Sequence, residues 1–208
     1  MASAVLAGPP QAPSAVLFMA SDSASSPLAK RQIIVGVCGG IAAYKSADLV
    51  SKLVQSGAGV TVCMTNDAQK FVQPLTFEAL SGKKVRTEIF DLADSSDPQH
   101  IALTEQSDLF IIAPATAHTI AKIAHGFCDD IISLLAIAAA CPILLAPAMN
   151  NHMWENPIAQ ENVKKLSANK NYHLIGPDEG WLACRNTGPG RMSEPTKILE
   201  EAQRLLNK

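Results

Sequence analysis

The sequence has little charge, and the charge it has is not clustered. Lys and Arg together number 17 and Asp and Glu number 19 among 208 residues, so the formal net charge is -2. No run of Lys or Arg is present to bind the phosphates of a duplex, so nucleic acid is not expected as a partner. No stretch reaches the roughly 18 consecutive apolar residues of a transmembrane helix, so no membrane span is expected.

Sequence motifs for metals and disulfides are missing as well. The five cysteines (Cys38, Cys63, Cys128, Cys141 and Cys184) form no CxxC pair, and the five histidines have no HExxH spacing. A dedicated metal site is therefore not expected. Three of the cysteines lie in apolar segments, where a thiol packs as a small core residue. This pattern indicates a reduced, cytoplasmic protein.

Residues 1–30 lack the periodicity of a folded segment. They are rich in Ala, Ser and Pro and carry almost no charge. Such a composition cannot bury enough surface to offset the entropy lost on ordering, so we expect a disordered leader. An unprocessed tail is favoured over an organelle transit peptide because Arg is absent before Arg31. Residues 31–208 are expected to form one domain with a single core.

From residue 32 onward, short apolar runs alternate with segments of helical periodicity. The first run, QIIVGVC, is followed by two glycines and then by apolar residues at helical spacing. Four further runs, at residues 59–64, 109–113, 143–146 and 172–175, are also expected to be strands. Continuous apolar strands separated by helices are typical of a parallel sheet covered on both faces. The predicted fold is therefore a single Rossmann-like, doubly wound α/β domain.

The ends of three predicted strands carry small and hydroxyl-bearing residues. Gly39 and Gly40 follow the first strand, Thr65 follows the second, and APATAHT at residues 113–119 ends the third. Paired glycines let the backbone approach a ligand, and a helix start offers free N–H groups to a phosphate. The motif is not GxGxxG, so the glycines alone are equally compatible with a tight turn. Together the three strand ends favour a mononucleotide cofactor.

Three later segments carry groups suited to chemistry. His100 stands at the expected start of a short helix, where it is either a proton-transfer group or a solvated residue. Asn150 follows the fourth strand in a turn, with donor and acceptor groups available. The neighbouring Met153 can be core filler, since Met fills irregular gaps. Residues 180–192 are expected to form a glycine-rich loop in which Cys184 is an accessible thiol.

The chain from about residue 32 to residue 206 resembles the homo-oligomeric flavin-containing cysteine decarboxylases. The segments that carry the resemblance are GVCGGIAAYKSADLV, HIALTEQSDLFIIAPATA, PAMNNHMW and LACRNTGPGRMSEP. The PxMNxxMW pattern combined with a glycine-rich cysteine loop is far more specific than either segment alone. The resemblance implies an FMN enzyme with active sites between the subunits of a homotrimer, which can assemble further into a homododecamer.

The resemblance also implies roles for individual residues. Those implied to be catalytic are His100, Asn150 and Cys184, with Asn150 holding the substrate carboxylate and Cys184 donating a proton. Those implied to contact the substrate are Asn150, Met153, Ala183 and Arg185. Those implied to bind FMN are Gly39, Gly40, Ile41, Thr65, Ala115 and Thr116.

The activity that the resemblance implies is decarboxylation of 4'-phosphopantothenoylcysteine to 4'-phosphopantetheine in coenzyme A biosynthesis, a carboxy-lyase reaction. The alternatives are an oxidative decarboxylase of a peptide C-terminal cysteine and a non-enzymatic relative that regulates a phosphatase. Cys184 counts against the first, because the reductive half of the reaction needs a proton donor. His118, Arg185 and Asn186 depart from the family pattern. Arg185 could reach a substrate phosphate or alter closure of the loop, so the effect on substrate choice stays open.

Overall fold

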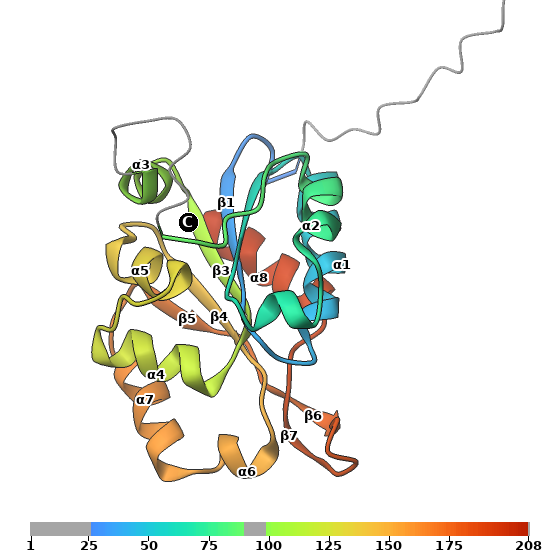
Figure 1. The fold of residues 1–208 in the computed structure, drawn as a ribbon, viewed down its shortest axis with the longest axis vertical. Coiled ribbons are helices and arrows are strands. Elements are labelled where there is room, and N and C mark those ends of the chain that lie inside the picture. Colours follow the sequence, from blue (N-terminus) through green and yellow to red (C-terminus); the bar gives the residue numbers. More distant parts are fainter. Residues whose placement is uncertain (1–25, 90–98, 208) are drawn as a thin grey trace, which may run out of the picture.

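A five-stranded parallel sheet forms the centre of the protein (Figure 1), in the order β2-β1-β3-β4-β5. The computed structural model describes residues 26–89 and 99–207, without the side chains of residues 99–101. The strands are β1 (Gln32–Val37), β2 (Gly59–Met64), β3 (Leu109–Ala115), β4 (Ile143–Pro147) and β5 (Tyr172–Leu174). The five predicted strands and the doubly wound α/β fold are therefore confirmed.

Helices cover both faces of this sheet (Figure 1). One face packs against α1 (Ala43–Gln55), α2 (Pro74–Ser81) and α8 (Pro195–Leu206). The other packs against α4 (Ala117–His125), α5 (Ile131–Ala138) and α7 (Pro157–Ser167). Shorter helices lie in the connections: η2 (Ala68–Lys70), α3 (Gln99–Glu105) and α6 (Asn151–Trp154).

The central strands are apolar over nearly their whole length because both of their faces are buried. In β1, Ile33 and Val35 belong to the core on the α1 side, whereas Ile34 belongs to the core on the α4 side. β1 pairs in parallel with β2 on one edge and with β3 on the other. Since all the carboxyl ends of a parallel sheet meet at one edge, the residues that follow these strands are brought together there.

Residues 178–191 differ from the predicted glycine-rich loop. They form an antiparallel hairpin of β6 (Asp178–Trp181) and β7 (Thr187–Arg191), which lies beside α6 in Figure 1. The sequence prediction missed it because glycines and a proline occupy β7, and such residues are depleted in strands. The hairpin is held by its own backbone pairing and by docking on the domain, and not by an alternating apolar pattern.

The folded unit begins before the predicted boundary at residue 31. Leu28 is fully buried in the core, and the N–H of Lys30 donates to the carbonyl oxygen of Gly57 at 2.9 Å. Residues 26–30 therefore belong to the fold. The rest of the predicted leader, residues 1–25, lies outside the described residues.

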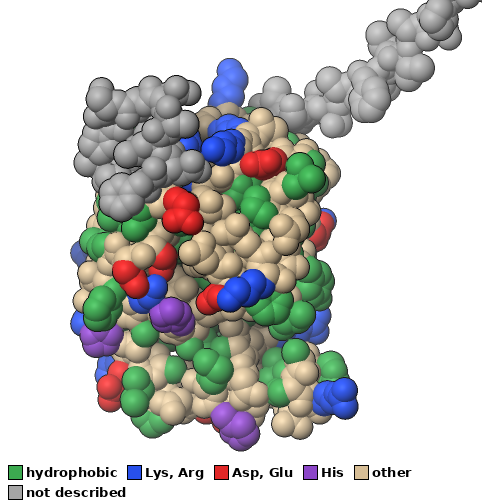
Figure 2. All heavy atoms as spheres, viewed as in Figure 1, with side chains coloured by type: hydrophobic (Ala, Val, Ile, Leu, Met, Phe, Trp, Pro, Cys, Tyr) green, Lys and Arg blue, Asp and Glu red, His purple; other side chains and the backbone are tan. Residues whose placement is uncertain are grey.

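The surface has no continuous basic region on the face shown in Figure 2, where Lys and Arg side chains are scattered among acidic and uncharged ones. In the part of the chain that the structure describes, none of the helices combines the length and apolar character needed to cross a membrane.

Candidate cofactor and substrate site

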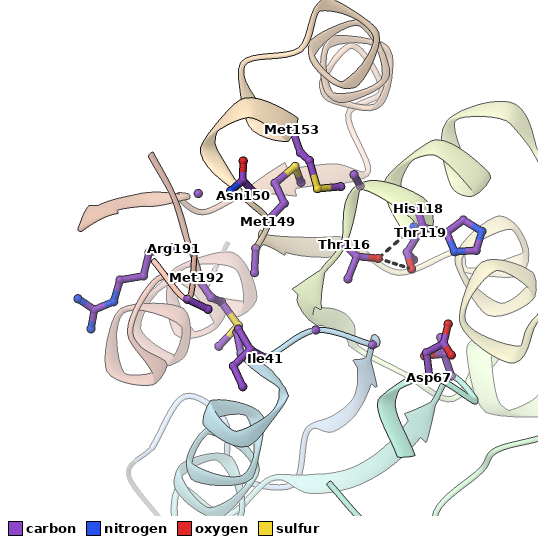
Figure 3. A pocket seen from close by; sticks show the side chains of 18 of the residues that line it. Ile41, Asp67, Thr116, His118, Thr119, Met149, Asn150, Met153, Arg191 and Met192 are labelled. Atoms are coloured by element: carbon purple, nitrogen blue, oxygen red, sulfur yellow. Dashed lines mark hydrogen bonds between the residues drawn. The ribbon is translucent and has the colours of Figure 1, made fainter. Parts of the chain in front are cut away.

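A cavity of about 760 Å³ opens at the carboxyl edge of the parallel sheet. This volume lies in the range typical of small-molecule sites. The walls come from the turns after β1, β2, β3 and β4 and from the β6–β7 hairpin. Figure 3 shows side chains from these segments arranged around a common space. The predicted convergence of the strand ends is therefore confirmed.

The turn after β1 uses its two glycines in different ways. A Cβ atom at Gly39 would overlap Asp67 in the turn after β2, so glycine is needed for these two turns to pack together. A Cβ atom at Gly40 would meet only the Thr116 methyl group, at 3.6 Å. The N-cap of α1, Ala42, makes no side-chain capping hydrogen bond. The N–H groups of Ala43 and Lys45 already donate to the carbonyl oxygens of Gly40 and Ala42, at 2.9 and 3.0 Å, so the other N–H groups at the start of α1 are those available to an anionic ligand beside Gly40.

The turn after β3 places Thr116 at the cavity and Ala115 behind it. Thr116 is the N-cap of α4, and its Oγ1 accepts a hydrogen bond from the N–H of Thr119 at 3.3 Å. Ala115 is fully buried in the core, and its carbonyl oxygen accepts from the N–H of Ala148 at 3.0 Å. The predicted cofactor residues that line the cavity are Gly39, Gly40, Ile41, Thr65 and Thr116. Ala115 does not line it, because its side chain packs under the α4 face of the sheet.

Asn150 lies in the turn after β4 and also lines the cavity. It is the N-cap of α6, and its Oδ1 accepts a hydrogen bond from the N–H of His152 at 2.8 Å. This bond assigns Oδ1 to the helix cap and leaves the Nδ2 group without a partner among the described residues. Asn150 therefore offers a neutral N–H donor at the cavity.

The hairpin reaches the cavity because β7 docks on the same turn after β4. The N–H of Met149 donates to the carbonyl oxygen of Gly190 at 2.9 Å. A Cβ atom at Gly190 would overlap the Met149 carbonyl group, and its φ of +135° also favours glycine. This docking brings Ala183 and Cys184 into the cavity lining.

Cys184 is the exposed cysteine of the described chain, and its side chain lines the cavity. Burial raises the pKa of the Cys38 and Cys63 thiols to about 12, which keeps them protonated and inert. Cys184 is therefore the thiol placed for chemistry. In residues 26–89 and 99–207, no three His, Cys, Asp or Glu side chains gather as a metal site would require.

The remaining predicted site residues lie in three different settings. Met153 lines the cavity and is 49% exposed, so it is not core filler. Arg185 is exposed next to Cys184 and does not itself line the cavity. His100 belongs to α3 by its backbone, and its side chain is outside the part of the chain that the structure describes. His118, a departure from the family pattern, lines the cavity.

A charged group on the cavity wall was not singled out from the sequence. The Lys122 ammonium contacts Asp129 at 2.9 Å and Asp130 at 2.8 Å. Burial would lower the pKa of Lys122, but the two carboxylates outweigh it and raise that pKa. The same contact lowers the pKa of Asp129. The signal was present in the sequence, since Thr116, Thr119 and Lys122 follow at steps of three, which places them on one side of a helix.

Two further cations line the cavity, and they share one carboxylate. Lys45 of α1 contacts Glu194 Oε1 at 2.9 Å, and Arg191 of β7 contacts the same oxygen. The hydrogen bond from Lys45 is the main cause that lowers the pKa of Glu194. Glu194 therefore ties the hairpin to α1 and gives both cations a partner, with one net positive charge left at this wall of the cavity.

An α/β domain with such a cavity at the carboxyl ends of parallel strands belongs to the class of nucleotide-type cofactor-binding domains. The sequence model of one family, described as Flavoprotein, matches residues 21–207. The chain therefore belongs to the Flavoprotein family.

Curated relatives support this membership over most of the chain. The chain is 45% identical over 177 residues to the coenzyme A biosynthesis bifunctional protein CoaBC of Bacillus subtilis. These residues make up 85% of the chain and 43% of that protein. It is 42% identical over 175 residues to the protein of the same name from Escherichia coli K12, with 84% and 43% covered. The chain thus spans less than half the length of these relatives.

Solved structures share the fold over nearly their whole length. A cysteine-to-serine variant of PPC decarboxylase, complexed with pantothenoylaminoethenethiol, has a TM-score of 0.77 and 28% identity, with 86% of this chain and 100% of that chain covered. The FMN-dependent cysteine decarboxylase SpaF has a TM-score of 0.76 and 31% identity, with 87% and 99% covered.

Proposed function

We propose that the protein catalyses the FMN-dependent decarboxylation of 4'-phosphopantothenoylcysteine to 4'-phosphopantetheine, a step of coenzyme A biosynthesis. The observation that carries the proposal is that Asn150 and Cys184, from segments far apart in the sequence, line one cavity together with the Gly39–Gly40 turn. The identity of 45% to a coenzyme A biosynthesis protein over most of the chain supports this substrate.

The cavity suits FMN in size and in the placement of its polar groups. The open side of Gly40 and the uncapped start of α1 fit a phosphate. Apolar side chains that include Ile41 and Met192 offer a surface for a flat ring system, with the Thr116 hydroxyl beside them. Bound FMN would supply the two-electron redox chemistry, which protein side chains cannot provide. The residues proposed to hold FMN are Gly39, Gly40, Ile41, Thr65 and Thr116. Ala115 would support them from its buried position in the core.

Asn150 is proposed to bind the carboxylate of the substrate through its Nδ2 group. Because Oδ1 is engaged in the α6 cap, the amide is fixed with its donor free. A neutral donor can orient the carboxylate without the strong attraction of a cation, which would oppose its departure as CO2. The role of Asn150 is therefore orientation of the leaving group.

Cys184 is proposed to donate a proton to the product carbon during the reductive half of the reaction. Its thiol is exposed at the cavity, and a thiol can act as an acid near neutral pH. Ala183 and Met153 are proposed to contact the substrate beside it. His100 is proposed as a third catalytic group on its sequence context alone.

The assembly is proposed to be a homotrimer or a homododecamer in the cytoplasm. Three large apolar side chains of the cavity wall, Ile41, Tyr44 and Trp181, are 60%, 61% and 66% exposed. A neighbouring subunit would remove this apolar surface from water.

The test of the proposed function is turnover by the purified protein. Protein carrying bound flavin is incubated with 4'-phosphopantothenoylcysteine, and CO2 release and product mass are followed. Release of CO2 with formation of 4'-phosphopantetheine is expected. A flavin-loaded protein that leaves this substrate unchanged would exclude the function.

The same assay separates a second candidate, oxidative decarboxylation of a cysteine-containing substrate. The 31% identity to SpaF, an FMN-dependent cysteine decarboxylase, is the observation that favours it. Such an enzyme would release an enethiol, whose mass is two hydrogens below that of the reduced thiol. We expect the reduced thiol, because Cys184 is placed to supply its proton.

Substitution of Asn150 by Asp tests carboxylate recognition without removing the α6 cap. Asp is as good an N-cap as Asn, so the turn is expected to keep its structure. The new carboxylate would repel the carboxylate of the substrate, and turnover should fall by about 100-fold or more with flavin retained. Unchanged turnover would exclude this role of Asn150.

A further inference from the structure

Arg185 occupies an unusual backbone conformation at the tip of the hairpin. Its φ is +65°, and Lys30 is the other non-glycine residue with positive φ in the described chain. The tip is closed by two backbone hydrogen bonds of 2.9 Å, from Leu182 N–H to Asn186 and from Arg185 N–H to Leu182. Glycine would adopt this conformation without the steric cost that a side chain adds. The tip therefore holds an arginine in a backbone conformation that glycine would adopt more easily.

Arg185 also differs from the cations of the cavity wall in having no partner. Lys122 contacts two aspartates, and Lys45 and Arg191 share Glu194. The Arg185 guanidinium makes no hydrogen bond or ion pair with any described residue. Among the described cations on or next to the cavity wall, Arg185 thus has its charge available to a ligand. An unpaired guanidinium next to a residue of the cavity lining is placed to bind an anion.

The position of Arg185 indicates which anion it meets. Its neighbour Cys184 lines the cavity, whereas Arg185 lies just outside the lining. With the cysteine end of the substrate at Cys184 inside the cavity, the exposed tip beside it is the place that we assign to the other end. In 4'-phosphopantothenoylcysteine the end opposite the cysteine carries a phosphate, and a guanidinium matches phosphate oxygens with two parallel N–H donors.

We propose that Arg185 is a specificity-determining residue that binds the phosphate of the substrate at the mouth of the cavity. This inference rests on the proposed function. The hairpin would then favour the phosphorylated substrate, while Asn150 and the turns at the carboxyl edge of the sheet bind the reacting end and the cofactor.

The experiment compares two substrates that differ only in the phosphate, 4'-phosphopantothenoylcysteine and pantothenoylcysteine. The kcat/KM ratio of the two is measured for the flavin-loaded wild-type protein and for Arg185→Gly. Glycine relieves the positive φ, so this variant is expected to fold. The ratio should fall by about tenfold, through a higher KM for the phosphorylated substrate, since the phosphate is remote from the reacting atoms.

Lys30→Gly is the matched control, because Lys30 has the same φ of +65°, is also cationic and exposed, and lies in the turn before β1. It should leave the substrate ratio unchanged. Arg185→Lys should keep part of the preference, because a lysine retains the charge and loses the two-pronged geometry. Increasing salt should reduce the preference of the wild-type protein.

Binding of the two products, 4'-phosphopantetheine and pantetheine, gives a measurement independent of turnover. Isothermal titration of Arg185→Gly should show that the ratio of the two affinities also falls by about tenfold. If Arg185→Gly weakens the phosphorylated and unphosphorylated compounds equally, Arg185 acts in closure of the hairpin and the proposal is overturned. Unchanged kcat/KM and affinity for both compounds would also overturn it. Failure of the wild-type protein to turn over either substrate would instead overturn the proposed function.

Discussion

The sheet rim and the β6–β7 hairpin line the same cavity, yet they are stabilised in different ways. The rim consists of the turns that follow the parallel strands, and β3 and β4 have every residue buried. In the two strands of the hairpin Gly190 alone is buried, and Trp181 is 66% exposed. It is attached to the domain by a backbone contact between Gly190 and Met149, by buried Met192, by the ion pairs of Glu194, and by the ion pair of Asp178 in β6 with Lys197 in α8.

This difference separates two tasks of the site. Packing of the core holds the rim, so the rim can offer a fixed surface to a cofactor. Few long-range contacts hold the hairpin, and segments with few buried contacts open at low free-energy cost. A cofactor that stays bound suits the first region, and a substrate that enters and leaves suits the second. Variants of the rim should therefore lose flavin, whereas variants of the hairpin should lose substrate binding or turnover with flavin retained.

Cys184→Ser gives the largest expected effect, because it removes the proposed proton donor on the hairpin and leaves the turns of the sheet rim unchanged. A serine hydroxyl is a much weaker acid than a thiol, so formation of the reduced product should fall by about 100-fold or more. Mass spectrometry should detect the oxidised enethiol, and the absorbance of bound flavin should be retained.

Cys128→Ser is the matched control, since Cys128 does not line the cavity. It should form the reduced product at the wild-type rate. Full production of the reduced thiol by Cys184→Ser would show that another group donates the proton.

Gly39→Ala attacks the rim, where the added Cβ overlaps Asp67. Overpacking of this kind should lower the free energy of unfolding by about 1–3 kcal/mol and reduce flavin content together with it. Gly40→Ala should leave the unfolding free energy nearly unchanged, because its Cβ meets only Thr116 at an ordinary distance. It should still weaken flavin binding. Denaturant unfolding and flavin absorbance measure the two effects, and equal stability loss in both variants would contradict the assignment.

Gly190→Ala attacks the contact between the hairpin and the Asn150 turn. The added Cβ overlaps the Met149 carbonyl, and the positive φ adds strain. We expect KM for the substrate to rise about tenfold while flavin stays bound, because undocking affects the hairpin and not the rim. Gly188→Ala on the same strand meets only the Asn151 side chain and should have a smaller effect. Flavin loss in Gly190→Ala would show that the two regions are not separable.

Glu194→Gln gives the smallest expected effect and tests the ion pairs of the hairpin. The folded pKa of Glu194 is lowered chiefly by Lys45, so its contribution to stability is complete above the unfolded pKa. That contribution is lost as pH falls through the lower, folded value. At neutral pH the variant should lose under about 1 kcal/mol of unfolding free energy, and in acid, below the lowered folded pKa of Glu194, the difference should vanish. A difference that persists in acid would contradict the ionic origin.

Several features of the site could be predicted from local sequence. The apolar runs at 32–37 and 109–115 have no polar alternation, which only strands buried on both faces can have. Gly39, Thr65 and Thr116 follow such runs, so a parallel sheet had to bring them to one edge. Asn150 and Cys184 stood out through the resemblance, and both line the cavity.

Tertiary structure alone decided the features that join segments distant in the chain. Residues 178–191 form a hairpin whose glycine at position 190 fits against Met149, and no local pattern encodes that contact. The pairing of Lys45 with Glu194 likewise depends on how α1 and α8 pack. Local sequence determines which backbone a segment prefers, whereas partners across the cavity are selected only when the whole core closes.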